Sequence, residues 1–184
     1  MPATPIGLSS ELATLGAMAT GGAPSTPDAL RARLEASRRA LFDAIEGLDE
    51  EGFRRRPGPS QWSPAEVLAH LLLMEQQLLT WAQAALAAPD EYEFVWLSED
   101  ARRDQAQAAQ RMPVPQILHG LLAQRRETVW LLETLDAGQL AKTCRVVGRG
   151  SFPVALLFQR MADHEEEHAR QVREARAQAA QRAT

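Results

Sequence analysis

The sequence predicts an all-α fold, a four-helix bundle, and three observations support this prediction. Four long segments repeat apolar residues three or four positions apart, the spacing of an amphipathic helix. Each segment starts near a proline, and the first three end before a glycine or a proline. The connections are rich in turn-forming residues. Four such helices commonly pack as an antiparallel-type bundle, whose facing helices build ligand and metal sites.

The chain is expected to divide into a tail and one domain. Residues 1–26 are rich in Ala, Gly, Thr, Ser and Pro, and they predict a flexible N-terminal tail with one short helix near residues 10–18. Residues 27–181 predict a single four-helix-bundle domain. A chain of 184 residues is long enough to fold without disulfides or metals.

The first two helices have clear start signals. Thr26 is the expected N-cap of the first helix, which is followed by Pro27 and ends near Leu48. The second helix starts after Ser63, and Glu66 closes a capping box with that serine. Trp62 and Val67 are placed to form a hydrophobic staple at this start. Pro64 occupies the first helical position, and the helix extends to about Ala88. The first apolar face consists of Leu30, Leu34, Leu41, Ile45 and Leu48, and the second of Val67, Leu71, Met74, Leu78, Trp81 and Ala85.

The third helix follows a long crossover, residues 89–112, in which Ser98 is expected to cap a short helix. It starts near residues 113–115 and stops before Gly138. The crossover is long enough to run the length of the bundle. In that case the second and third helices lie parallel, and the fourth helix returns antiparallel to both.

The fourth helix is expected to begin with Ser151 as its cap and Pro153 just inside, and to run towards Gln181. The connection before it contains a short extended piece around residues 145–147. Cys144, the only cysteine, lies in the same connection, so no intrachain disulfide can form, and we expect an unreactive loop thiol.

Charge and hydropathy exclude several classes of partner. The formal net charge is -4 and the pI is near 5.6, which argues against a nucleic-acid-binding surface. No segment approaches the ~20 apolar residues of a membrane span, and the N-terminus lacks the pattern of a signal peptide. We therefore expect a cytoplasmic protein whose partner is a small molecule or a protein.

Three histidines carry the most specific signal. His164 and His168 are four residues apart, so both lie on one face of the fourth helix and can reach one ion. His70 lies on the apolar stripe of the second helix, and antiparallel packing would bring it to a similar depth. A lone histidine on an apolar stripe is usually a core residue, but three at one depth predict a site for one divalent metal ion. His119 lies off the stripe of its helix and is expected at the surface or rim.

Two other metal sites fit the sequence less well. The residues from His164 to His168 match the HExxH pattern of zinc metalloproteases. Such a protease needs a third ligand after the motif and usually a strand edge to align the peptide, whereas only sixteen residues follow, with Glu174 as their sole carboxylate. A di-iron bundle requires two Glu-x-x-His motifs on two helices. Glu165 and His168 form one such motif, whereas Val67 occupies the glutamate position before His70.

The run from Trp62 to Leu71, followed by the histidine pair, resembles the DinB/YfiT-like superfamily of small bacterial four-helix bundles over roughly residues 28–178. The resemblance implies an up-down-down-up bundle with one divalent metal ion, most often zinc or nickel, with iron or manganese as alternatives. By motif position, the implied ligands are His70, His164 and His168. Characterised relatives resemble metal-dependent transferases or isomerases that use low-molecular-weight thiols such as bacillithiol, mycothiol or glutathione.

Three neutral imidazoles leave the ion an open position, as in catalytic sites. We therefore expect a metal-dependent thiol S-transferase or hydrolase that presents a thiolate or a hydroxide to a small electrophile. Glu66 and Glu165 are candidate catalytic residues, because each could orient a ligand imidazole or relay a proton; the capping box and solvation are their simpler explanations. Arg160 could meet an anionic substrate at the rim or form an exposed salt bridge. The alternative is a non-catalytic, dimerising stress-related bundle in which the metal is structural or absent.

Overall fold

The computed structural model describes residues 26–58, 61–95, 104, 111–148 and 150–182. The elements are α2 (Pro27–Ile45), α3 (Glu50–Arg54), α4 (Pro64–Ala87), β1 (Tyr92–Phe94), α6 (Val114–Glu133), α7 (Ala137–Ala141), β2 (Thr143–Val146), β3 (Gly150–Pro153) and α8 (Val154–Arg182). The predicted short helices near residues 10–18 and after Ser98 lie outside the described residues. Within the described part of the chain, no helix has the length and apolar character needed to cross a membrane.

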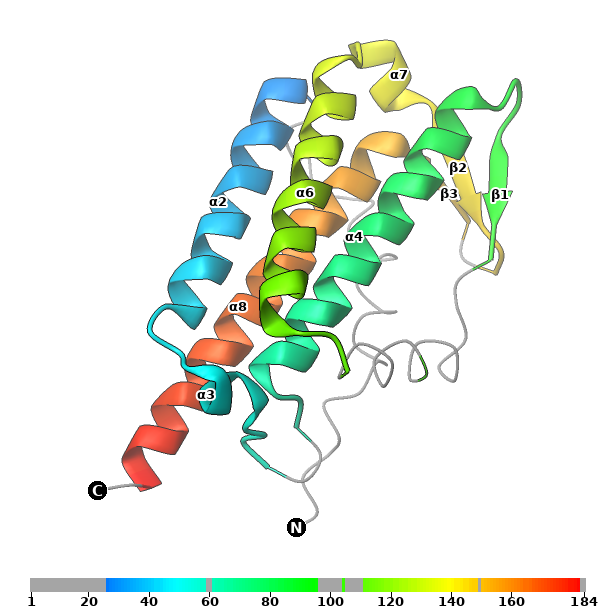
Figure 1. The fold of residues 1–184 in the computed structure, drawn as a ribbon. Coiled ribbons are helices and arrows are strands. Elements are labelled where there is room, and N and C mark those ends of the chain that lie inside the picture. Colours follow the sequence, from blue (N-terminus) through cyan, green and yellow to red (C-terminus); the bar gives the residue numbers. More distant parts are fainter. Residues whose placement is uncertain (1–25, 59–60, 96–103, 105–110, 149, 183–184) are drawn as a thin grey trace.

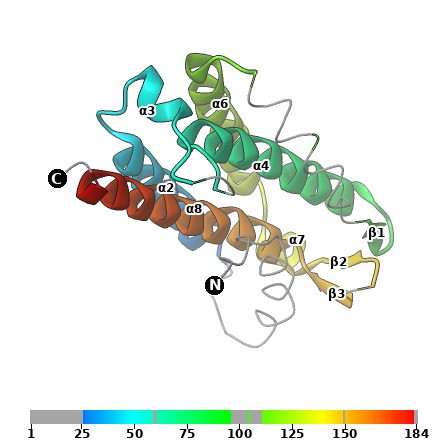
Figure 2. The same cartoon turned by 90° about the horizontal axis from the view of Figure 1, so that it is seen from below.

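The four long helices form the predicted bundle (Figure 1). Helices α2 and α8 run in one direction, and α4 and α6 run in the other, so the up-down-down-up arrangement is confirmed. Helix α4 ends at one end of the bundle and α6 begins at the other, which means that the connection between them crosses the length of the bundle. Helix α8 packs between α2 and α4, and α6 packs against both α4 and α2, as the view from below also shows (Figure 2).

Local capping fixes where the helices start. Oγ1 of Thr26 accepts a hydrogen bond from the backbone N–H of Ala29 at 3.3 Å, which confirms the first N-cap. At the start of α4, Ser63 and Glu66 exchange the two hydrogen bonds of a capping box, at 3.3 and 2.7 Å. An N-cap of this kind stabilises a helix by about 1 kcal/mol. The cap also fixes the position of His70, which lies two turns into α4.

The start of the fourth helix differs from the prediction. Ser151 and Pro153 belong to strand β3, and α8 begins at Val154, so the expectation that Ser151 caps this helix is wrong. Strand β3 pairs antiparallel with β2, and β1 pairs parallel with β2. Gly148 and Gly150 have φ angles of 78° and 96°, a region that glycine adopts easily, and this permits the tight reversal between β2 and β3. Pairing of the strands removes Ser151 and Pro153 from the helix.

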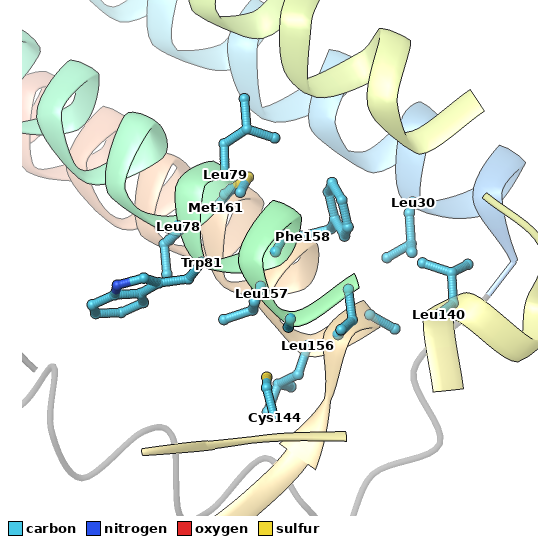
Figure 3. Packing of buried hydrophobic residues seen from close by; sticks show 14 of the residues in the cluster. Leu30, Leu78, Leu79, Trp81, Leu140, Cys144, Leu156, Leu157, Phe158 and Met161 are labelled. Carbon is cyan, nitrogen blue, oxygen red and sulfur yellow. The ribbon is translucent and has the colours of Figure 1, made fainter. Parts of the chain in front are cut away.

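Cys144 lies in strand β2 and is fully buried, which corrects the expectation of a loop thiol. Burial, with a smaller effect of the Glu91 charge, raises the pKa of its thiol to about 12. It belongs to the apolar cluster at the strand end of the bundle, part of which is shown in Figure 3. A second apolar cluster occupies the other half of the bundle.

Candidate metal centre

Three imidazoles converge between α4 and α8. His70 comes from α4, and His164 and His168 come from successive turns of α8. Nε2 of His164 lies 3.2 Å from Nε2 of His70 and 3.1 Å from Nε2 of His168, and the three ligand atoms lie within 4.8 Å of one another. The structure therefore brings together all three histidines that the sequence predicts as ligands.

The two spacings that involve His164 fit a shared metal ion. Two nitrogens bound to one ion at about 2.0–2.1 Å are roughly 2.9 Å apart at a right angle and roughly 3.4 Å apart at the tetrahedral angle. The distances of 3.1 and 3.2 Å fall inside this interval. His70 and His164 are buried, and His168 is partly buried, so the donors face one another inside the bundle. The donor set matches the three-ligand pattern of catalytic rather than structural sites.

Gln171 orients one of the three rings. Its Oε1 lies 2.7 Å from Nδ1 of His168. A carbonyl oxygen only accepts hydrogen bonds, so Nδ1 of His168 donates and the ring keeps a lone pair on Nε2. This is the tautomer that a ligand at Nε2 requires. Gln171 is not among the residues that the sequence predicts for the site; its position three residues after His168 on the same helix is the signal that identifies it.

Trp62 covers one side of the centre. Its ring lies edge-on to His70 with the centroids 4.8 Å apart, and it stacks on His168 at 6.2 Å with an angle of 14° between the planes. Trp62 also packs against the apolar cluster that includes Val67, which agrees with the predicted staple. Because Trp62 immediately precedes the cap Ser63, the start of α4 holds the indole over the imidazoles. The prediction gave Trp62 a role in folding only.

A small cavity lies beside Trp62 and Gln171, towards the C-terminal end of α8. It has a volume of about 50 Å³, and its walls include Trp62, Gln171, Val172 and Gln178. Two of these residues, Trp62 and Gln171, also contact His168. A buried water occupies roughly 10–15 Å³ on this scale, so the cavity has room for a few waters or a small chemical group next to the two residues that contact His168.

Glu165 lies on a different side of α8 from the histidines. It is only 2% exposed, so the expectation that solvation explains it is wrong. Its carboxylate accepts hydrogen bonds from Ser37 at 2.5 Å, from Arg38 at 2.5 Å and from Arg125 at 2.9 Å. These three donors come from α2 and α6. Glu165 therefore anchors α8 to two other helices beside His164.

Arg38 and Arg125 also bind Glu75, which completes a buried network of two positive and two negative charges across all four long helices. Arg38 donates to Glu75 at 2.6 Å, Arg125 at 2.7 Å and Thr128 at 2.9 Å. Burial alone would raise the pKa of Glu75, but the positive charges and hydrogen bonds of Arg125, together with the charge of Arg38, hold the pKa below its usual value. The network links the four long helices through Glu165, the residue next to His164.

Glu66 lies one turn before His70 and is held by the cap of α4. Its carboxylate accepts hydrogen bonds from the backbone N–H of Ser63 at 2.7 Å and from Nε of Arg56 at 3.0 Å. Burial would raise its pKa, but these hydrogen bonds and the charge of Arg56 lower it. Glu66 is therefore ionised at neutral pH.

Arg160 is buried and His119 is exposed. Arg160 is 3% exposed, so it is not the exposed rim residue that the sequence suggested. Its Nη1 lies 3.6 Å from Oε2 of Glu167. His119 is exposed on α6, as predicted, and is not one of the three convergent histidines.

Comparison with solved structures places the fold. The chain is similar to YfiT from Bacillus subtilis, described as a probable metal-dependent hydrolase with an unusual four-helix bundle topology. The two sequences are 15% identical, and the TM-score is 0.65 over 79% of this chain and 85% of that chain. The comparison with curated proteins finds no match. The model of the DinB superfamily matches residues 33–172, a range that includes the three convergent histidines and most of the bundle. This chain belongs to the DinB superfamily.

Proposed function

We propose that this protein is a metal-dependent enzyme that acts on a small electrophilic substrate, by hydrolysis or by transfer to a low-molecular-weight thiol. The convergence of three Nε2 atoms carries the proposal, because three neutral imidazoles leave a bound ion at least one open position. The similarity to a probable metal-dependent hydrolase supports the same chemistry. Zinc or nickel is the expected ion, with iron and manganese as alternatives.

A divalent ion in this place would act as a Lewis acid and lower the pKa of a coordinated water or thiol. The residues of the chain prepare the site for it. Gln171 keeps the proton on Nδ1 of His168, so Nε2 remains available as a ligand. Trp62 excludes water from one side of the imidazoles. Glu66, ionised and one turn before His70, is the candidate base for moving a proton from a bound nucleophile.

Elemental analysis of protein purified without a histidine tag tests the metal site. We expect about one metal ion per chain, lost in His70→Ala and His168→Ala variants that keep the helical circular dichroism of the unmodified protein. His119→Ala is the matched control, because His119 is an exposed histidine on α6. Unchanged metal content in the two ligand variants would contradict the proposal.

Turnover assays then separate the enzyme from a metal-binding bundle without catalysis. Model esters and amides test hydrolysis, and an electrophile such as 1-chloro-2,4-dinitrobenzene with several thiols tests transfer. We expect activity that disappears with the metal and with His168→Ala. A protein that binds metal fully but accelerates none of these reactions would favour the non-catalytic alternative.

A further inference from the structure

Among the described residues, one guanidinium nitrogen of Arg160 on α8 has no hydrogen-bond partner. Its Nη1 is buried, and in the described part of the chain it is the one buried side-chain nitrogen or oxygen without a hydrogen-bond partner. Arg38 and Arg125 are also buried, but each donates to two carboxylates and to a backbone carbonyl oxygen. Charged groups are rarely buried without such compensation. Arg160 is therefore a donor that a ligand could satisfy.

Arg160 lies one turn of α8 from the nearest histidine of the metal centre. Arg160 is one turn before His164 on the same side of α8. Its Nη1 reaches to 3.6 Å from Oε2 of Glu167, seven positions further along the helix. Seven residues rise roughly 10 Å, so the side chains of Arg160 and Glu167 extend towards each other along α8. The guanidinium is therefore directed towards the turn that carries His164.

Glu167 is a weak partner for this group. Its side chain is 46% exposed, and the 3.6 Å separation is longer than a hydrogen bond. Exposed ion pairs contribute little, because water solvates both charges well. By contrast, Glu75 and Glu165, which pair with the other two buried arginines, are at most 5% exposed. Glu167 can therefore turn towards solvent and leave Arg160 to another carboxylate.

We propose that Arg160 binds a carboxylate of the small molecule that occupies the open position at the trihistidine centre. The proposal rests on the proposed function and specifies its substrate class: an anionic compound with a carboxylate a few bonds from the group that meets the metal. A guanidinium fork matches a carboxylate in shape and charge. The bound carboxylate replaces Glu167 as the partner of Arg160, so Arg160 keeps an ion pair when the ligand binds.

Cobalt-loaded protein tests the proposal without an activity assay. Thiol binding to Co²⁺ gives a charge-transfer absorption band, which can be titrated with two probes of similar length, 3-mercaptopropionate and 2-mercaptoethanol. Comparison between variants cancels the intrinsic difference between the probes. We expect Arg160→Gln to weaken 3-mercaptopropionate binding roughly tenfold or more and to leave 2-mercaptoethanol binding unchanged, because only the former has a carboxylate.

Three further variants sharpen the result. Arg170→Gln is the matched control, since Arg170 is an exposed arginine of α8 paired with Glu174. It should leave both affinities unchanged. Arg160→Lys keeps the charge and should retain part of the preference for 3-mercaptopropionate over 2-mercaptoethanol. This variant replaces Arg160→Gln in the test if Arg160→Gln folds poorly. Glu167→Gln removes the competing carboxylate and should strengthen 3-mercaptopropionate binding about two- to fivefold.

The outcomes separate the two proposals. Failure of the unmodified protein to bind cobalt would overturn the proposed function and this inference together. Two results obtained with normal cobalt binding would overturn only the proposal that Arg160 binds a carboxylate. One is an equal loss of affinity for both thiols in Arg160→Gln. The other is unchanged affinity for both thiols in Arg160→Gln and in Glu167→Gln. A selective loss for the carboxylate-bearing thiol supports the site.

Discussion

Nδ1 of His168 donates a hydrogen bond to Oε1 of Gln171 at 2.7 Å, so a residue one turn away sets the tautomer of a metal ligand. Gln171→Leu removes the acceptor and allows the proton to move to Nε2. We expect it to weaken metal affinity about 10–100-fold, as measured by competition with a chromogenic chelator. Gln116→Leu is the control, at an exposed glutamine of α6. An affinity in Gln171→Leu equal to that of the unmodified protein would contradict the assigned role.

The buried charges predict how stability depends on pH. The pKa of Glu75 lies below its ordinary value of 4.5 in the folded protein. A carboxyl group with a lowered pKa stabilises the fold above its unfolded pKa, and this contribution is lost as the pH falls through the folded pKa. The free energy of unfolding should therefore decrease as the pH falls below 4.5. Urea denaturation followed by circular dichroism at several pH values measures this.

The Glu75→Gln variant should lose about 3–5 kcal/mol of stability at neutral pH, because Arg38 and Arg125 are left with one carboxylate between them. Its stability should also depend less steeply on pH in the acidic range. Glu174→Gln, in an exposed ion pair, should cost no more than about 1 kcal/mol. Equal acid slopes for Glu75→Gln and the unmodified protein would show that the network does not control acid stability.

Trp62 should report metal binding by its fluorescence. Its ring is 4.8 Å from that of His70 and 6.2 Å from that of His168. Addition of Co²⁺ or Ni²⁺, which quench nearby fluorophores, should lower tryptophan emission in proportion to occupancy. Trp62→Phe should remove most of this response, whereas Trp130→Phe, at an exposed position on α6, should preserve it. Undiminished quenching in Trp62→Phe would show that the ion binds elsewhere.

Cys144 should be unreactive in the folded protein. Burial raises the pKa of its thiol to about 12, and the thiolate is the reactive form. Ellman's reagent near neutral pH should modify no thiol in native protein and one per chain after unfolding in guanidinium chloride, since the sequence has a single cysteine. Rapid modification of native protein would place Cys144 at the surface.

Sequence reasoning predicts the four long helices because their signals are local. Thr26, Ser63 and the prolines after them act within one turn, and the apolar stripes mark the faces that pack. The histidines are found the same way, since a spacing of four on one helix and a buried position on another are visible without coordinates. The antiparallel relation of α4 and α8 then brings His70 to the depth of His168.

Features that depend on distant residues escape this reasoning. Strand β1 pairs with β2 across about fifty residues of sequence, so no local pattern marks it as part of a sheet. Ser151 and Pro153 have the sequence pattern of a helix start, but they pair with β2 as part of strand β3. Glu165 looks solvated because its partners Arg38 and Arg125 lie on other helices. Only the packed bundle shows that these charges meet.

The central claim is that the Nε2 atoms of His70, His164 and His168 hold one metal ion. Crystals grown with Zn²⁺ or Ni²⁺ and measured on either side of the absorption edge of the metal test it most directly. We expect one anomalous peak at about 2.0–2.1 Å from all three Nε2 atoms. A well-ordered map with no peak between these imidazoles, or with peaks only at surface residues, would contradict it.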